Sequence, residues 1–208
     1  MIEYENLIAE AEKFVGLNSH DHDGGHDWWH IKRVRDMAMY IHSMEKSGDT
    51  LVVELGALLH DVGDSKFLKT TLDETNRLII DFLFPLDVTK NVIDQVLFIN
   101  NNISFSKGKK PESMTPEFMI VQDADRLDAI GAIGIARAFN YGGFRNNPIF
   151  DPSGKEKTTI DHFADKLLKL KDMMNTDTAR ELASERHEYM EKFLRQFAKE
   201  VTIGRDLK

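Results

Sequence analysis

The sequence predicts an all-α protein, and three observations support this fold class. Apolar residues recur at spacings of three and four along most of the chain, strand-like alternation is not convincing anywhere, and loop-forming residues separate the apolar stripes. With 208 residues, 41% of them hydrophobic, and no repeat at solenoid spacing, the chain can bury a substantial core. We therefore predict one compact helical domain over residues 1–208.

The expected helices follow from the stripes in chain order. An acidic amphipathic stretch, MIEYENLIAEAEKF, comes first. Apolar stripes then predict helices over 29–41, 51–59, 78–83, 88–97, 118–133, 160–174 and 182–197. Pro85 accounts for the break between the third and fourth of these stripes. Trp28 and Trp29 are expected in the core because each can bury a large area.

Two connections stand out by composition, 100–116 and 141–157. The first carries three lysines with a glycine and two prolines, and the second has three glycines, two prolines and Arg145. Such composition is typical of solvated connectors, and it also fits a basic lid over phosphates.

Composition also excludes several classes of protein. The absence of cysteine rules out disulfides, iron–sulfur clusters, thiolate zinc sites and cysteine nucleophiles. No window approaches ~18 uninterrupted apolar residues, so we expect a soluble, cytoplasmic protein without a membrane span. The net charge of -8 disfavours a nucleic-acid surface, because clustered Lys and Arg hold polyphosphate backbones. A small anionic substrate would need a local cationic patch or a bound metal ion.

Four candidate metal ligands lie at helical registers that could aim them into a shared interior: His30, His60, Asp61 and Asp125. The adjacent pair follows LGALL, where the dipole of a helix C-terminus disfavours a carboxylate, and a bound cation would offset that cost. His30 alone fits a buried core histidine as well as a ligand. Spacing does not separate the last aspartate from Asp123 and Asp128, which fit solvent-facing residues or groups that hold a ligand in place.

The segments HDWWHIKRV, LLHDVGDSKF and VQDADRLDAIGAIGIARAF resemble the HD-domain superfamily of metal-dependent phosphohydrolases, specifically its small bacterial single-domain branch. The resemblance spans nearly the whole chain and implies a helical bundle with a metal site between helices. It assigns the metal ligands to His30, His60, Asp61 and Asp125. Many relatives carry a histidine near NNNISFS, where this chain has Asn101, Asn102 and Ile103, which favours one divalent metal ion over two.

The resemblance also implies hydrolysis of a phosphate ester or anhydride, most plausibly in a nucleotide. A nucleoside triphosphate pyrophosphohydrolase or a nucleotide phosphatase ranks first, and a cyclic-nucleotide phosphodiesterase second. Nitrogen and oxygen ligands suit Mn, Fe, Co, Ni or Zn, and Mg is also open. Asp64 is the candidate to orient or deprotonate the attacking water, although it fits a turn residue equally well. The candidates for contacting phosphate are Lys66, His26, Arg126, Arg145 and Lys166.

Two further classes are considered. His26 and His30 stand four apart, as in the helical metalloprotease motif H-E-x-x-H, but Asp27 is one methylene shorter than the glutamate of that motif. A third ligand at the usual short spacing is also missing. The other class is a non-catalytic nucleotide sensor, which would bind nucleotide without turnover. The sequence does not indicate an oligomeric state.

Overall fold

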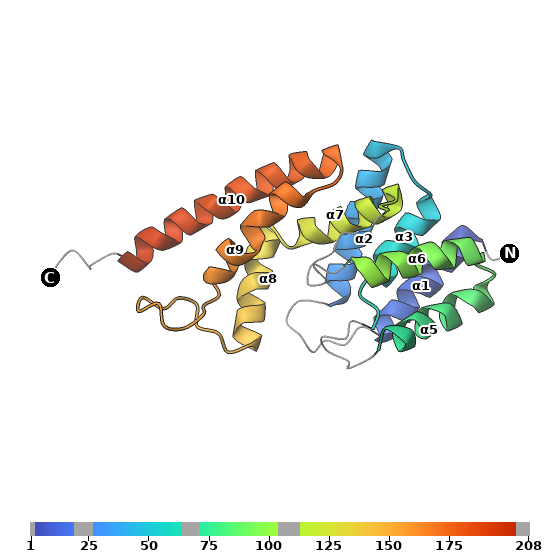
Figure 1. Ribbon diagram of the computed structural model, residues 1–208, viewed down its shortest axis with the longest axis horizontal. Helices are drawn as coiled ribbons and strands as arrows, with labels where there is room; N and C mark the ends of the chain where they lie inside the picture. The colour runs from blue at the N-terminus through green and yellow to red at the C-terminus, as the bar shows by residue number, and fades with distance from the viewer. Residues whose placement is uncertain (1–2, 19–26, 64–70, 104–112, 203–208) are drawn as a thin grey trace. The chain divides into compact units, whose positions relative to one another are not determined.

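The computed structural model describes residues 3–18, 27–63, 71–103 and 113–202, and within these ranges it contains helices and no strand (Figure 1). The all-α prediction is confirmed. The α-helices are α1 (Tyr4–Asn18), α2 (Trp28–Glu45), α3 (Thr50–Leu59), α5 (Leu72–Leu83), α6 (Lys90–Asn102), α7 (Pro116–Asp128), α8 (Gly131–Phe144), α9 (Asp161–Asp165) and α10 (Asp177–Thr202). Two 3-10 helices accompany them, η1 (Phe84–Leu86) and η3 (Leu167–Met173).

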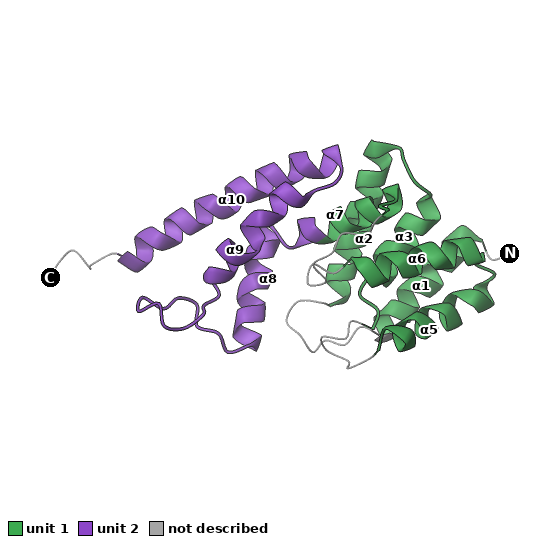
Figure 2. Ribbon diagram, viewed as in Figure 1, with its two compact units in different colours: residues 1–125 green, residues 126–208 purple. Residues whose placement is uncertain are grey.

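The chain divides into two compact units, residues 1–125 and residues 126–208 (Figure 2). The first unit contains α1 to α6 and most of α7, and the second contains α8 to α10. The expectation of one domain over the whole chain stays a prediction.

Helix α3 lies at the centre of the first unit, where it packs against α1, α2 and α6. Every residue from Val52 to Leu59 is buried, because this helix is apolar on all sides. Gly56 lets α6 approach closely, since a Cβ atom there would lie 2.7 Å from Ile99 Cδ1. The close approach brings the C-terminal part of α6 against the end of α3.

The one carboxylate buried within α3 is paired. Glu54 accepts hydrogen bonds from Arg35 on α2, with Nε at 2.7 Å, and from the Tyr4 hydroxyl on α1. A buried charge is tolerated when it is both paired and hydrogen-bonded. These contacts tie three helices of the first unit together.

In the second unit, α10 packs against α8 and η3, and α9 packs against η3. Three phenylalanines from different elements meet there, with ring centroids 5.9 to 6.1 Å apart: Phe139, Phe163 and Phe193. Aromatic packing of this kind supplies a second region of core.

The prediction of a single helix over 118–133 is wrong, because the structure has two helices in its place. Helix α7 ends at Asp128, and α8 begins at Gly131, whose φ of +74° is a left-handed conformation that glycine adopts readily. Ile133, which the stripe placed in the core, is exposed. The stripe over 160–174 is likewise divided, since Lys166 leaves helical geometry between α9 and η3.

The prediction that both tryptophans are buried is wrong for Trp29. Trp28 packs against the core cluster of the first unit, whereas 62% of Trp29 is exposed. The inward stripe of α2 starts at His30 and continues through Ile31, Val34 and Ala38. Tyr189 lies within the apolar stripe predicted over 182–197, and it too is exposed, because the buried face of α10 passes through Ala183 and Met190.

Pro85 separates α5 from α6 as predicted, and it lies within η1. The two predicted connections, 100–116 and 141–157, overlap helices at their starts. Asn100–Asn102 belong to α6, and residues 141–144 belong to α8. Among the described residues, none of the helices is both long enough and apolar enough to span a bilayer.

Candidate metal centre

His30 reaches the centre of the first unit from the first turn of α2. Asp27 is the N-cap of this helix, and its carboxylate accepts a hydrogen bond from the His30 backbone N–H at 2.8 Å. Aspartate is a favourable N-cap because its side chain satisfies an N–H that has no partner within the helix. The His30 side chain is fully buried, on the same face as Ile31 and Val34.

His60 and Asp61 lie where α3 ends. His60 is the C-cap residue of that helix, and Asp61 follows in a turn. The His60 Nδ1 lies 2.7 Å from the carbonyl oxygen of Ala57, which can only accept a hydrogen bond. Nδ1 therefore carries the proton in the neutral imidazole, and Nε2 has a lone pair available for a metal ion.

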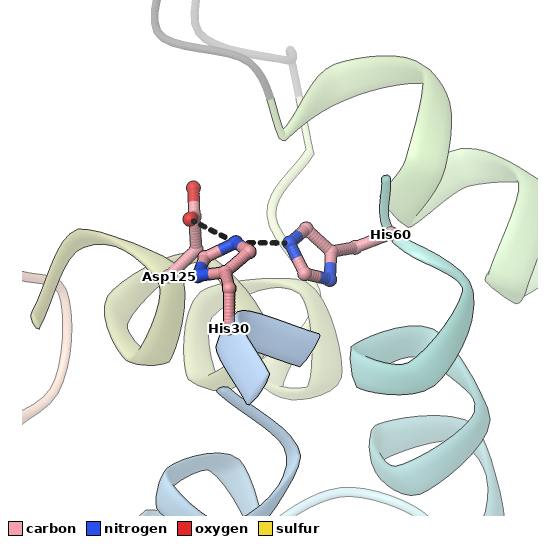
Figure 3. Close-up of side chains that lie close together, drawn as sticks. All are labelled: His30, His60 and Asp125. Atoms are coloured by element: carbon pink, nitrogen blue, oxygen red, sulfur yellow. Dashed lines mark hydrogen bonds and ion pairs between the residues drawn. The ribbon is translucent and has the colours of Figure 1, made fainter. Parts of the chain in front are cut away.

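The fourth ligand atom comes from Asp125 on α7. His30 Nε2 lies 3.3 Å from His60 Nε2 and 3.7 Å from Asp125 Oδ1, as the dashed lines in Figure 3 mark. Asp61 Oδ2 lies 3.3 Å from His30 Nε2 and 3.4 Å from His60 Nε2. Thus the four predicted ligand residues come from two helices and the end of a third, and His60 Nε2, Asp61 Oδ2 and Asp125 Oδ1 lie within 3.3 to 3.7 Å of His30 Nε2.

These distances fit a divalent cation. A metal ion about 2.1 Å from each ligand atom separates neighbouring ligands by about 3.0 Å in octahedral and about 3.4 Å in tetrahedral geometry. The four separations given above, 3.3 to 3.7 Å, lie within or slightly above this range. His30, His60 and Asp125 also offer ligand atoms that all lie within 4.8 Å of one another. The cluster can therefore hold a metal ion.

The electrostatics of the cluster favour a positive charge. Burial alone would lower the pKa of His60, but the charges of Asp61 and Asp125 and the hydrogen bonds to Asp61 and Ala57 raise that pKa to about 9. A proton on His60 and a metal ion on its Nε2 are alternatives, because a ligand imidazole must be deprotonated. The carboxylates would stabilise either positive charge.

Asp123 and Asp128, the other two aspartates of α7 near Asp125, are not solvent-facing, so the prediction that they face solvent is wrong for both. Asp123 is completely buried within α7, and Asp128 is buried beside Arg137, whose guanidinium donates to its carboxylate at 2.8 Å. Asp125 is the most accessible of the three, with 32% of its side chain exposed. The register of α7 thus turns Asp125 toward His30 and away from the core that holds Asp123.

Three predicted site residues lie outside the described residues: His26, Asp64 and Lys66. The other three predicted phosphate contacts belong to the second unit. There the guanidinium of Arg126 donates to the Met173 carbonyl, and Arg145 Nε donates to the Tyr141 hydroxyl at 3.0 Å. Lys166 is half-buried at the end of α9. Their roles toward a substrate stay predictions.

The metalloprotease alternative is not supported by the start of α2. That motif needs both histidines on one helix, whereas α2 begins at Trp28 and Asp27 is its N-cap. In a protease of this kind the carboxylate of Asp27 would act on water, whereas here it accepts a hydrogen bond from the His30 backbone N–H.

Sequence reasoning missed two polar residues that contact the segment carrying the His60–Asp61 pair. The Asn100 side chain on α6 donates to the carbonyls of Leu59, His60 and Val62, at 2.8, 3.1 and 3.1 Å. The Thr75 hydroxyl on α5 donates to the Gly63 carbonyl at 3.1 Å. One signal was available: Asn100 lies four residues after Val96 and seven after Ile93, so it is a polar residue at a buried register.

The fold and the cluster together define a helical protein with a histidine–aspartate cluster that could hold a metal ion. A family model described as the HD domain matches residues 28–130, which span all four ligand candidates. The uncharacterized protein YpgQ of Bacillus subtilis is 47% identical over 187 residues, and the match covers 87% of each chain. The chain therefore belongs to the HD-domain family.

Solved structures agree with this assignment over nearly the whole chain. A crystal structure described as an HD-superfamily hydrolase from Bacillus thuringiensis matches with a TM-score of 0.81 and 39% identity, covering 97% of this chain and 100% of that one. The crystal structure of Bacillus subtilis YpgQ in complex with ADP matches with a TM-score of 0.77 and 40% identity, covering 93% of this chain and 97% of that one. The predicted family is confirmed.

Proposed function

We propose that this protein is a divalent-metal-dependent phosphohydrolase that acts on a nucleotide, either as a nucleoside triphosphate pyrophosphohydrolase or as a nucleotide phosphatase. The observation that carries the proposal is that His60 Nε2, Asp61 Oδ2 and Asp125 Oδ1 lie within 3.3 to 3.7 Å of His30 Nε2 in a member of the HD-domain family. The relative YpgQ has been crystallised in complex with ADP, which supports a nucleotide as the substrate class.

A divalent cation held by these four residues would supply Lewis acidity toward water and phosphoryl oxygens. The residues of the chain would hold and orient the reacting groups. His30, buried and fixed by the capped start of α2, offers Nε2 without rearrangement. Of the two carboxylates, that of Asp125 is the more accessible, with 32% of its side chain exposed against 19% for Asp61.

The remaining roles follow the sequence prediction. Asp64, three residues after Asp61, would orient the attacking water and accept its proton. Lys66, His26, Arg126, Arg145 and Lys166 are the candidates to neutralise phosphate charge, which a protein with a net charge of -8 must do locally. One metal ion, a nucleotide substrate and no stable nucleic-acid or membrane partner complete the proposal.

The test is hydrolysis after metal removal. The chelated protein is supplied in turn with Mn²⁺, Mg²⁺, Co²⁺, Ni²⁺ or Zn²⁺ and a panel of ribo- and deoxyribonucleotides, including cyclic ones, while orthophosphate, pyrophosphate and monophosphate products are measured. We expect metal-dependent release of pyrophosphate or orthophosphate. Opening of cyclic nucleotides alone would establish the phosphodiesterase, and metal-dependent binding without any product would establish the sensor.

A further inference from the structure

One side chain from α6 contacts three backbone carbonyls at the end of α3. Asn100 Nδ2 lies 2.8 Å from the carbonyl oxygen of Leu59 and 3.1 Å from those of His60 and Val62. The last carbonyls of a helix have no partner within the helix and need donors from elsewhere. A carboxamide nitrogen has two hydrogens, so three carbonyls around it share them.

These carbonyls belong to the peptide units that set the direction of the metal ligands. The His60 carbonyl is part of the peptide unit that joins His60 to Asp61, so a donor on its oxygen fixes the plane between the two ligand residues. A donor on the Val62 carbonyl fixes the plane of the peptide unit between Val62 and Gly63 in the same way. The orientation of Asp61 thus depends on a residue 39 positions later in the sequence.

The packing of α3 against α6 makes this reach possible. Gly56 has no side chain to separate the two helices, and a Cβ atom there would lie 2.7 Å from Ile99 Cδ1. Ile99 directly precedes Asn100, so the same close approach brings the carboxamide to the helix end. By contrast, Asn102 on the same helix donates to the Phe98 carbonyl of α6 itself, at 2.8 Å.

We propose that Asn100 is a positioning residue of the metal centre, which orients His60 and Asp61 for metal binding by fixing the backbone at the end of α3. This inference rests on the proposed function, because it assumes that the four-residue cluster binds a divalent cation. Groups that hold metal ligands in place typically change metal affinity by about 10-fold to 100-fold when they are removed.

The experiment uses Co²⁺ alone as the probe and compares four forms of the full chain. Asn100→Ala removes the carboxamide, Asn100→Leu replaces it with a side chain of similar branched shape and no donor, and Asn102→Ala is the matched control. Co²⁺ is titrated into each chelated protein, and its visible absorption spectrum reports affinity and ligand geometry. Circular dichroism and thermal unfolding without metal establish that each titration is made on folded protein.

We expect both Asn100 variants to bind Co²⁺ about 10-fold to 100-fold more weakly than the unmodified protein, with an altered spectrum, while Asn102→Ala matches the unmodified protein. If Asn100→Ala does not fold, the same expectation applies to Asn100→Leu. Unchanged affinity and spectrum in a folded Asn100 variant, even a less stable one, would overturn the positioning role alone. Failure of the unmodified protein to bind Co²⁺ would overturn the metal centre and this role with it.

Discussion

His30 and His60 present the same atom, Nε2, to the candidate metal centre, but the chain holds them in different ways. His30 lies inside the first turn of α2, which is capped by a residue three positions away. His60 and Asp61 lie at the end of α3, where contacts come from Asn100 on α6 and Thr75 on α5. The backbone that carries His30 is thus held by a local hydrogen bond, whereas the backbone around His60 and Asp61 is also contacted by side chains that are distant in sequence.

The largest effect expected at the helix end is that of Asp61→Ala. Asp61 contributes a carboxylate oxygen 3.3 Å from His30 Nε2, and it lies in the turn after α3 and outside the apolar core, so its removal should leave the helices folded. We expect metal affinity and metal-dependent hydrolysis to fall by more than about 100-fold, beyond the loss typical of groups that only hold ligands. Circular dichroism should show unchanged helicity.

Asp94→Ala is the matched control for this variant, because Asp94 is an exposed carboxylate on α6 whose partner is Lys90. It should retain metal binding and hydrolysis. If Asp61→Ala keeps metal-stimulated turnover, the assignment of the site is wrong.

The second prediction concerns pH. In the metal-free protein the pKa of His60 is about 9, above the value of about 6.5 expected in the unfolded chain. The folded state therefore binds this proton more tightly. Its contribution to stability is fully present below about pH 6.5 and is lost as the pH rises through about 9. A metal ion must displace the proton, so metal affinity should rise with pH, by at most about tenfold per unit, until about pH 9.

Denaturant unfolding of the chelated protein and Co²⁺ titration, each repeated across this pH range, check the two opposite trends. His60→Gln should remove the part of the pH dependence of unfolding free energy that the His60 proton causes between about pH 6.5 and about pH 9. A metal affinity that falls with rising pH would contradict the proposed competition between proton and metal.

Gly63→Ala tests the turn that follows the ligand pair. Gly63 has a φ of +71°, and a Cβ atom there would lie 2.4 Å from the hydroxyl oxygen of Thr75, which is buried and has little room to move. Gly154 has a similar φ of +67° with nothing within 4 Å of a Cβ atom. Alanine at Gly154 should cost about 1–2 kcal/mol for the left-handed conformation alone.

Alanine at Gly63 should cost more than this control and should also weaken metal binding, because the turn carries Asp61. Thermal unfolding and Co²⁺ titration of both variants measure the difference. Equal losses of stability, with unchanged metal binding, would mean that the turn does not contribute to the site.

Features that depend on local sequence could be predicted, whereas those that depend on tertiary contacts could not. The helical fold could be predicted from apolar spacing, which depends on local register, whereas the choice of the four ligand candidates also needed the resemblance, because spacing does not separate Asp125 from its neighbours. The sequence could not reveal that α7 stops before Gly131. At this position the φ is positive, and a Cβ atom would lie 2.9 Å from Cγ of Arg186 on α10. The sequence did not reveal Asn100 either, because that contact depends on how closely α3 and α6 approach, which is a tertiary property.

The smallest effect is expected on the helix that carries His30. Trp29 is 62% exposed, whereas Trp28 packs against the core of the first unit. Trp29→Ala should change the free energy of unfolding by less than about 0.5 kcal/mol, as surface substitutions usually do. Trp28→Ala should cost about 3 kcal/mol or more, because it removes a large packed side chain.

Chemical denaturation of the two variants measures this difference, and Co²⁺ titration shows whether either disturbs the metal centre. The capped first turn of α2 orients His30 through its backbone, so Trp29→Ala should leave metal affinity unchanged. A raised KM for nucleotides without loss of stability would instead place Trp29 against the substrate. A large loss of metal affinity would show that His30, like His60, depends on contacts beyond its own helix, and the contrast between the two ligands would disappear.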